Sequence, residues 1–335
     1  MKKALTAFCV CLGMAGLACG TASAADGKTY EFNLGHIQNQ GHDLYIAIDK
    51  LAKALETRSN GAIKVKVFPS SQLGTEREMI EQCAMGTLDI TPSDPAGWAT
   101  GLQLPELNVF GLPFMYNTLE AQKKVIDNVV LDEFQKRLIP KGIHPLAVYS
   151  NGIRHAIIKT KPIATMDDLK GLKMRCPENP LFVNTWRALG ANTVTVPWSE
   201  VYTALSQGVC DAAEADSVGI VNNNLHEVGK YLSHTGHMGG LWIVSMNEKK
   251  WQTLPKEIQE IFTQVFAESS AEQIAHRKTS DDAAEKVLAD KGIVINEVSA
   301  AELAKMRQAV DPLYQEYADK YGMGELIKKI LESAK

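Results

Sequence analysis

The sequence predicts an α/β protein made of two similar lobes with a ligand cleft between them. Strand-like and helix-like segments alternate in the order strand, helix, strand, helix, strand, and this order occurs twice, once on each side of Asn151. Such an alternation favours parallel strands with helices packed on the faces of the sheet. After an N-terminal export signal about 310 residues remain, which is more than one compact core usually organises.

The first lobe is expected to begin with a strand over residues 30–35, where apolar and polar residues alternate. Apolar residues then recur at helical spacing over residues 42–55, and a second alternating strand follows over residues 63–68. A helix over residues 77–85 and a strand over residues 87–91 complete the unit. If these strands are parallel, the loops that follow them gather at one edge of the sheet.

The second lobe is expected to start after a turn at Asn151-Gly152, with a strand over residues 153–158. Its alternating unit consists of strands at 172–176, 192–196 and 209–213, joined by helices at 179–189 and 199–207. The remaining predicted segments are a packed loop at 104–114, a helix at 121–138, strands at 143–149, 241–247 and 293–297, and helices at 300–321 and 323–333.

A long helix is predicted over residues 255–291, because this stretch has no glycine and no internal proline. Pro255 at its start and Gly292 after its end match the usual asymmetry of helix termini. At about 1.5 Å per residue it would be roughly 50 Å long and would have to lie along both lobes. A break near Ser269 is the alternative. We assign residues 25–151 and about 241–280 to the first lobe, and 152–240 and about 281–335 to the second.

The N-terminus has the three parts of a secretory signal peptide. Two lysines follow the first methionine, an apolar run too short to span a bilayer comes next, and small residues precede a cleavage site after Ala24. No later stretch approaches the length of a transmembrane helix. We therefore expect an exported, soluble protein of the periplasm. A lipoprotein anchored through Cys19 is the alternative.

The charge balance limits the partners. The formal net charge is −4, and loss of the two N-terminal lysines makes it −6. A mildly acidic surface argues against nucleic acid or an anionic membrane as the partner. An acidic ligand must therefore be attracted by individual arginines and not by the overall field.

Three cysteines remain after the predicted cleavage site, an odd number for an oxidising compartment. Cys176 and Cys210 each lie in a strand-like segment, so they are candidates for a disulfide across neighbouring strands, with two free thiols as the alternative. Cys83 lies in a helical pattern and is expected to be a buried apolar residue. The spacing of cysteines and histidines indicates no metal site.

Arg175 is the first candidate for ligand binding. It lies two residues before Pro177, which ends a predicted strand preceded by a short helix ending at Gly171. Open α/β sheets bind ligands beyond the carboxyl ends of their strands. A guanidinium at such an end offers a rigid fork of donors that matches a carboxylate or a phosphate. The alternative is a structural ion pair between Arg175 and a neighbouring acid.

Seven short motifs of this chain occur in a fixed order. They are Ser71-Gln72-Leu73-Gly74, Gly86-Thr87-Leu88-Asp89, Leu112-Pro113-Phe114, Asn151-Gly152-Ile153-Arg154, Asp168-Leu169-Lys170-Gly171-Leu172-Lys173-Met174-Arg175, Trp198-Ser199-Glu200-Val201-Tyr202-Thr203-Ala204-Leu205 and Gly208-Val209-Cys210-Asp211. With these motifs in this order, nearly the whole chain after residue 24 resembles the solute-binding proteins of tripartite ATP-independent periplasmic (TRAP) transporters, of the dicarboxylate-binding DctP type. The resemblance implies a fold of the periplasmic-binding-protein type, which closes on an organic acid without a cofactor and delivers it to a membrane permease.

The resemblance also implies roles for single residues. Arg175 would form a bidentate ion pair with the ligand carboxylate, and Arg154 would be a second arginine facing the ligand. Trp198 would pack on the ligand, and Glu76 and Asp94 would be the first lobe's contribution to the cleft. Two alternatives stay open: Trp198 in the core of a lobe, and Glu76 as an exposed acid at the start of a helix.

The chain departs from the family pattern at two places. The family commonly has Gln-Glu-Asn-Pro after the strand near Asp211, but this chain has Glu214 and Asp216 there and lacks the amide. An asparagine that commonly follows Pro177 is Glu178 here. Acids near the cleft favour a ligand with hydroxyl or ammonium donors beside its anionic group. A sugar acid, a polyol phosphate or an amino-acid-like acid fits this better than a plain dicarboxylate.

A periplasmic enzyme is the competing class of protein. The chain contains no Gly-x-Ser-x-Gly, no His-Glu-x-x-His and no glycine-rich phosphate loop. His155 follows Arg154 directly, but adjacent side chains of a strand point to opposite faces, so a shared site is not expected. A ligand sensor that presents its closed form to a receptor kinase would have the same fold, and the sequence does not separate that role from transport.

Overall fold

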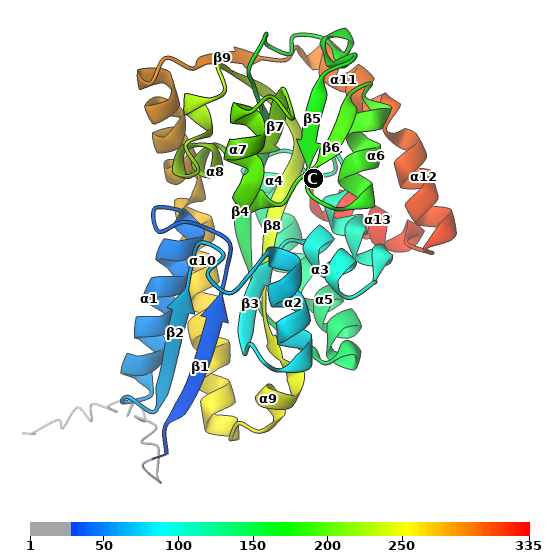
Figure 1. The fold of residues 1–335 in the computed structure, drawn as a ribbon. Coiled ribbons are helices and arrows are strands. Elements are labelled where there is room, and N and C mark those ends of the chain that lie inside the picture. Colours follow the sequence, from blue (N-terminus) through cyan, green and yellow to red (C-terminus); the bar gives the residue numbers. More distant parts are fainter. Residues whose placement is uncertain (1–27) are drawn as a thin grey trace, which may run out of the picture.

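The structure is a computed structural model, and it describes residues 28–335. The predicted cleavage site after Ala24 and the alternative anchor Cys19 lie outside the described residues. Figure 1 shows two α/β halves, one above the other, joined by β4 (Ile143–Ile158), β8 (Tyr231–Asn247) and the long helix α10 (Lys256–Asp290). The predicted two-lobed α/β fold is confirmed.

The described strands form a single sheet. Its order is β2-β1-β3-β8-β4-β7-β5-β6, with β9 paired to β8. The other strands are β1 (Tyr30–Gly35), β2 (Ile63–Phe68), β3 (Ile90–Ser93), β5 (Lys173–Cys176), β6 (Asn192–Thr195), β7 (Ala212–Ala215) and β9 (Val294–Glu297).

Strand direction places the functional edges of the two halves opposite each other. β1, β2 and β3 are parallel to one another, and so are β5, β6 and β7. The pairs β3–β8, β8–β4 and β4–β7 are antiparallel. The carboxyl ends of the first set therefore face the carboxyl ends of the second set, and the loops that follow both sets meet between the halves.

The predicted turn at Asn151-Gly152 is wrong, because β4 continues through it as one strand of 16 residues. The pair instead sits where the register of β4 against β8 shifts, between Ser150 and Ile153. Gly152 adopts a left-handed φ of +64°, which bends the strand without ending it. β8 likewise extends the predicted strand at 241–247 to 17 residues.

Helix α10 runs for 35 residues without interruption, so the alternative of a break near Ser269 is wrong. At about 1.5 Å per residue its length is roughly 50 Å. It packs against α1 and β4 and continues to α8 in the other half. The prediction of one helix along both lobes is confirmed (Figure 1).

One side chain of α10, Arg277, binds acids from both halves. Its guanidinium pairs with Asp43 at the start of α1 (2.9 Å), with Asp216 just after β7 (2.6 Å) and with Asp281 one turn along α10 (2.6 Å). The side chain is 1% exposed. A Cβ on Gly152 would lie 2.5 Å from Nη2 of Arg277. The glycine in β4 therefore gives the guanidinium its space against the strand.

The other helices cover the faces of the sheet. The α-helices are α1 (Asp43–Arg58), α2 (Glu76–Met85), α3 (Pro95–Gly101), α4 (Leu119–Val125), α5 (Leu131–Leu138), α6 (Pro180–Ala188), α7 (Val201–Ser206), α8 (Ser217–Asn222), α9 (Glu248–Gln252), α11 (Ala300–Ala309), α12 (Asp311–Lys320) and α13 (Gly324–Ser333). Short 3₁₀ helices are η1 (Pro105–Gly111), η3 (Ile139–Lys141), η4 (Met166–Leu169), η5 (Trp198–Glu200) and η6 (Leu225–Glu227), and a π-helical segment, η2 (Ile126–Val130), joins α4 to α5.

Two further predictions of local structure are wrong. The stretch at 104–114 contains the regular 3₁₀ helix η1, which Pro105 starts, where a loop without regular structure was expected. The predicted helix at 300–321 is two helices, because Val310 is not helical and Pro312 follows it in the first turn of α12.

The buried apolar side chains form three clusters in the described part of the chain. One of them reaches from Ile80 of α2 in one half to Trp186 of α6 in the other. None of the helices in residues 28–335 combines the length and apolar character of a membrane span. Since packing continues between the halves, the residue boundaries of the lobes stay a prediction.

Candidate ligand-binding site

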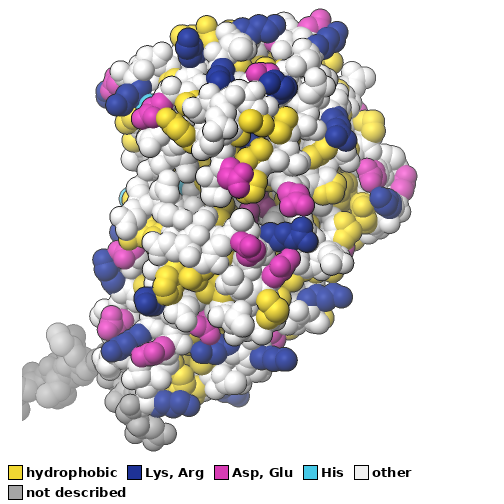
Figure 2. Space-filling model, in the orientation of Figure 1, with side chains coloured by type: hydrophobic (Ala, Val, Ile, Leu, Met, Phe, Trp, Pro, Cys, Tyr) yellow, Lys and Arg dark blue, Asp and Glu magenta, His cyan; other side chains and the backbone are white. Residues whose placement is uncertain are grey.

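A cavity of about 160 Å³ lies where the carboxyl ends of the two strand sets face each other. A smaller cavity of about 40 Å³ continues inward from it and shares Arg175, Trp198, Glu76 and Asp94 with it. Residues of α2 and α3 line one side and residues that follow β5 and β6 line the other. Figure 2 shows acidic and basic side chains close together at mid-height of this face, where the halves meet. Such a space holds a small molecule and not a polymer.

Arg175 lies at the carboxyl end of β5 with 2% of its surface exposed. Its Nε and Nη2 donate to the carbonyl oxygen of Val196, at 2.9 and 2.7 Å. Among the described residues no carboxylate lies within ion-pair distance of it, so the alternative of a structural ion pair is wrong. Burial lowers the pKa of Arg175 from its usual value, and the like charge of Arg154 acts in the same direction.

The bonds to Val196 decide which edge of the guanidinium remains for a ligand. They occupy the side edge that Nε and Nη2 share. The terminal edge, formed by Nη1 and the second N–H of Nη2, has no hydrogen-bond partner in residues 28–335. Two parallel N–H groups at that edge match the two oxygens of a carboxylate.

Arg154 also lines the inner cavity, but an acid of the protein already binds it. Its Nε and Nη2 contact the carboxylate of Glu214 on β7, the latter at 2.9 Å. Burial opposes the charge on both groups, yet the pair holds the pKa of Glu214 down at about 2. Nε2 of His237 lies 3.4 Å from the same carboxylate. Arg154 therefore faces the cavity with its charge largely neutralised.

Glu76 and Asp94 lie together on the opposite wall. Ser93 Oγ donates to Oε1 of Glu76 at 2.7 Å, and the backbone N–H of Asp94 approaches the same oxygen at 3.4 Å. Asp94 caps α3 by accepting from the N–H of Gly97. Burial raises the pKa of Glu76 to about 8, and Asp94 adds to this shift. The alternative of Glu76 as an exposed surface acid is wrong, because its carboxyl faces the cavity.

The remaining candidates occupy different places around the cleft. Trp198 lines the cavity in η5, and its ring lies 5.6 Å from the guanidinium carbon of Arg175, so a place wholly within the core is excluded. Asp216 borders the inner cavity, caps α8 and pairs with Arg277. Glu178 lies at the rim with an exposed side chain, 3.5 Å from Arg77 of the other half.

The candidate disulfide is wrong: Cys176 and Cys210 are free thiols, and so is Cys83. In the parallel ladder of β5 and β7, Met174 pairs with Ala212. Cys176 therefore lies at the carboxyl end of β5, whereas Cys210 precedes the start of β7. The offset of four residues corresponds to roughly 13 Å along a strand, beyond the reach of a disulfide. Cys83 is buried in α2, as predicted.

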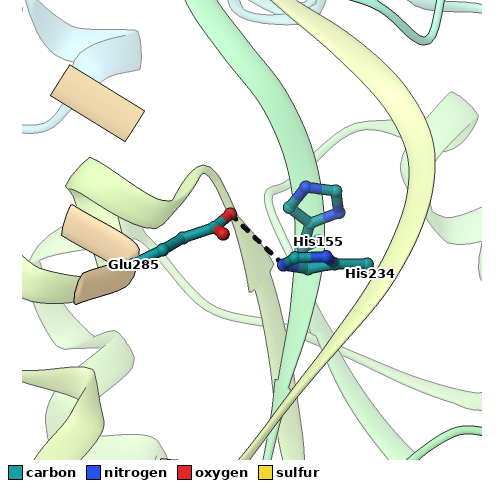
Figure 3. A group of neighbouring side chains, drawn as sticks. All are labelled: His155, His234 and Glu285. Carbon is teal, nitrogen blue, oxygen red and sulfur yellow. Dashed lines mark ion pairs between the residues drawn. The ribbon is translucent and has the colours of Figure 1, made fainter. Parts of the chain in front are cut away.

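His155, His234 and Glu285 form a separate group with metal-ligand chemistry (Figure 3). The two imidazole rings are tilted against each other, with centroids 4.4 Å apart and an angle of 31° between their planes. His234 Nδ1 binds Glu297 at 2.6 Å and its Nε2 lies 3.2 Å from Glu285. Nδ1 of His155 accepts from the N–H of Gly236. His234 is thus paired with two acids, and the candidate ligand atoms of the three residues lie within 4.8 Å of one another. None of the three residues lines the cavity described above.

Sequence reasoning missed three polar residues at the site. Gln38 and Asn151 line the inner cavity, and His237 approaches Glu214 from β8. Local pattern gives no signal for Asn151 and His237, because their partners lie far away in the sequence. Gln38 follows the first strand, and this position is an indication, since loops at such ends meet ligands.

Comparison with known proteins agrees with this geometry. Residues 34–320 match the family described as bacterial extracellular solute-binding protein, family 7. The 2,3-diketo-L-gulonate-binding periplasmic protein of Escherichia coli K12 is 33% identical over 249 residues, 74% of this chain and 75% of the relative.

Two solved structures show the same fold. The sugar acid binding protein of Advenella mimigardefordensis, in complex with galactonate, superposes with a TM-score of 0.87 at 26% identity and covers 92% of this chain and 98% of its own. A TRAP periplasmic solute-binding protein of Haemophilus influenzae with bound L-gulonate has a TM-score of 0.86 at 27% identity, with 91% and 99% covered. The family match spans most of the described residues, and a curated relative above 30% identity supports it. The chain belongs to family 7 of the bacterial extracellular solute-binding proteins.

Proposed function

We propose that this protein captures the anion of a sugar acid in the cavity between β5 and the α2–α3 wall, closes around it, and delivers it to a TRAP-type membrane permease. The chain would be exported, cleaved after Ala24, and would act in the periplasm. The proposal includes no catalytic step.

The observation that supports the proposal best is the state of Arg175. A buried guanidinium without an acid partner is costly, because the charge has lost its water and gained no counter-charge. A ligand carboxylate on the free terminal edge of Arg175 would remove that cost. Since Arg154 is held by Glu214, Arg175 is the group that binds the anion.

The acids of the site support a hydroxylated ligand over a plain dicarboxylate. Glu76 and Asp94 border the cavity from the wall opposite Arg175. Hydroxyl groups can donate to these acids, whereas a second ligand carboxylate would be repelled by them. The relatives point the same way, since the E. coli relative is named for 2,3-diketo-L-gulonate and the two solved structures hold galactonate and L-gulonate.

Closure follows from the division of the site between the halves. Arg175 and Trp198 belong to one half, and Glu76 and Asp94 belong to the other. A ligand that contacts both halves stabilises the closed form over an open form by the contacts that only the closed form provides. The permease would then recognise the closed, loaded protein.

A thermal-shift screen tests the ligand class. We expect galactonate and L-gulonate at millimolar concentration to raise the melting temperature by several degrees, because binding to the native state alone stabilises it. Succinate, a plain dicarboxylate, serves as the comparison and should give a much smaller shift. A screen in which succinate stabilises the protein and neither sugar acid does would contradict the proposed ligand class.

A further inference from the structure

Three charged groups of the cavity have no ion-pair partner among the described residues: Arg175, Glu76 and Asp94. The other charges nearby are paired. Arg154 binds Glu214, Asp216 binds Arg277, and Arg77 at the rim lies near Glu178. If a ligand carboxylate binds Arg175, Glu76 and Asp94 on the opposite wall remain without a cation.

These two acids pack against the same turn of the backbone. Oε1 of Glu76 accepts from Ser93, and Asp94 accepts from the N–H of Gly97. A Cβ on Gly97 would lie 3.1 Å from the carboxyl carbon of Glu76, so the glycine leaves room for this carboxyl. Within residues 28–335, Oε2 of Glu76 has no hydrogen-bond partner, whereas the carboxylate of Asp94 accepts from the backbone N–H groups of Gly97 and Ala96. Both residues line the cavity, where a ligand can reach the free oxygen of Glu76.

Two carboxyl groups placed this way in a closed cavity do not both ionise near neutral pH. Burial raises the pKa of Glu76 to about 8, with Asp94 adding to the shift, and burial also raises the pKa of Asp94. The charged groups that face the pair are Arg175 on β5, Arg154 on β4 and Glu214 on β7, with Arg77 and Glu178 at the rim. The charges of Arg154 and Glu214 cancel each other, and the ligand carboxylate neutralises Arg175. No cation then remains to ionise both acids, so Glu76 and Asp94 together keep one proton.

We propose that Glu76 and Asp94 share one proton in the closed cleft, that the protonated carboxyl donates a hydrogen bond to a hydroxyl oxygen of the ligand, and that ligand binding takes up this proton from solvent. The inference rests on the proposed function and adds the group that selects hydroxylated acids.

The sign of the pH dependence follows from the two states. In an open cleft the carboxyl of Glu76 would be solvated, with a pKa near its ordinary 4.5, whereas in this structure, with residues of both halves around the cavity, burial raises the pKa to about 8. Protonation therefore favours the closed, ligand-bound form. The association constant is highest at low pH and falls as pH rises between these values, by at most about tenfold per pH unit.

Titration calorimetry with galactonate at pH 5.5, 7.0 and 8.5 tests the proposal. Measurements in two buffers of different ionisation enthalpy give the number of protons taken up. For the wild type we expect uptake approaching one proton at pH 7.0, and an affinity that falls by tenfold or more between pH 5.5 and 8.5. Glu76→Gln, which imitates the protonated carboxyl, should bind with little pH dependence and should exceed the wild type in affinity at pH 8.5.

Two further variants keep the test specific. Asp94→Asn retains an amide oxygen that can cap α3 and should also flatten the pH profile. Glu260→Gln makes the same chemical change as Glu76→Gln on an exposed position of α10 that does not line the cavity, and it should keep the wild-type profile. A flat wild-type profile, or a Glu76→Gln profile as steep as that of the wild type, would overturn the shared proton while leaving sugar-acid binding intact. Failure of both galactonate and L-gulonate to bind at any pH would overturn the proposed function and this inference together.

Discussion

Replacement of Arg175 by alanine is expected to weaken the binding of galactonate by roughly 30-fold to several thousandfold. This range corresponds to about 2–5 kcal/mol, the cost of removing one partner of a buried, hydrogen-bonded charge pair. The reason lies in the position of Arg175: it is buried, its terminal edge faces the cavity, and no acid of the described chain pairs with it. Titration calorimetry at a fixed pH measures the loss directly.

Arg175→Lys is the matched variant, because it keeps the charge and loses the planar fork. It should bind more weakly than the wild type and more tightly than Arg175→Ala, since an ammonium group cannot make two parallel bonds to a carboxylate. The melting temperature of each variant without ligand serves as the control for folding. Wild-type affinity in Arg175→Ala would show that the anion binds elsewhere.

Replacement of Arg277 by methionine should cost about 3–5 kcal/mol of the free energy of unfolding, because it leaves buried acids without their cation. Burial raises the pKa of Asp43 and of Asp216, but the charges of Arg277 and His42 and the hydrogen bonds that these acids accept together outweigh it, so both pKa values lie below their usual range. Arg277 is the largest of these compensating contributions, so its loss leaves most of the cost of burial without compensation. Chemical denaturation at pH 7 measures the difference, and the midpoint should fall clearly.

Asp281→Asn is the control for the ion pairs of Arg277. Its effect on the free energy of unfolding should be absent or opposite in sign to that of Arg277→Met. Burial raises the pKa of Asp281 to about 6, even though Arg277 lowers it. A carboxyl whose pKa is higher in the folded state stabilises the fold at low pH, and this contribution is lost as pH rises through about 6. At pH 7 the asparagine should therefore equal or exceed the wild type in stability. A loss in Asp281→Asn as large as that in Arg277→Met would contradict this division of roles.

The order of strands and helices could be predicted from sequence because each element has its own periodicity. Residues 30–35 and 63–68 alternate clearly, and both strands appear as β1 and β2. The continuity of β4 could not be predicted, since Asn151-Gly152 has the composition of a turn. What makes it part of a strand is the pairing with β8 almost a hundred residues later, together with the space that Gly152 leaves for Arg277.

The candidate site was predicted unevenly for a related reason. Arg175 and Trp198 follow strands, so their place at the sheet edge could be inferred, and the structure puts both against the cavity. The pairing of Arg154 with Glu214 could not be inferred, because it depends on the register of β4 against β7. The same limit explains why the predicted disulfide is wrong. Two cysteines in neighbouring strands can bond only where the register places them side by side, and the register of β5 against β7 offsets Cys176 and Cys210 by four residues.

A crystal structure of the protein with galactonate tests the central claim most directly. We predict that the ligand carboxylate lies on the terminal edge of Arg175, with its oxygens at hydrogen-bond distance from Nη1 and Nη2, while Val196 keeps the side edge. A hydroxyl group of the ligand should lie within hydrogen-bond distance of Glu76. A carboxylate bound away from Arg175, or a ligand found outside the cavity between the halves, would contradict the account.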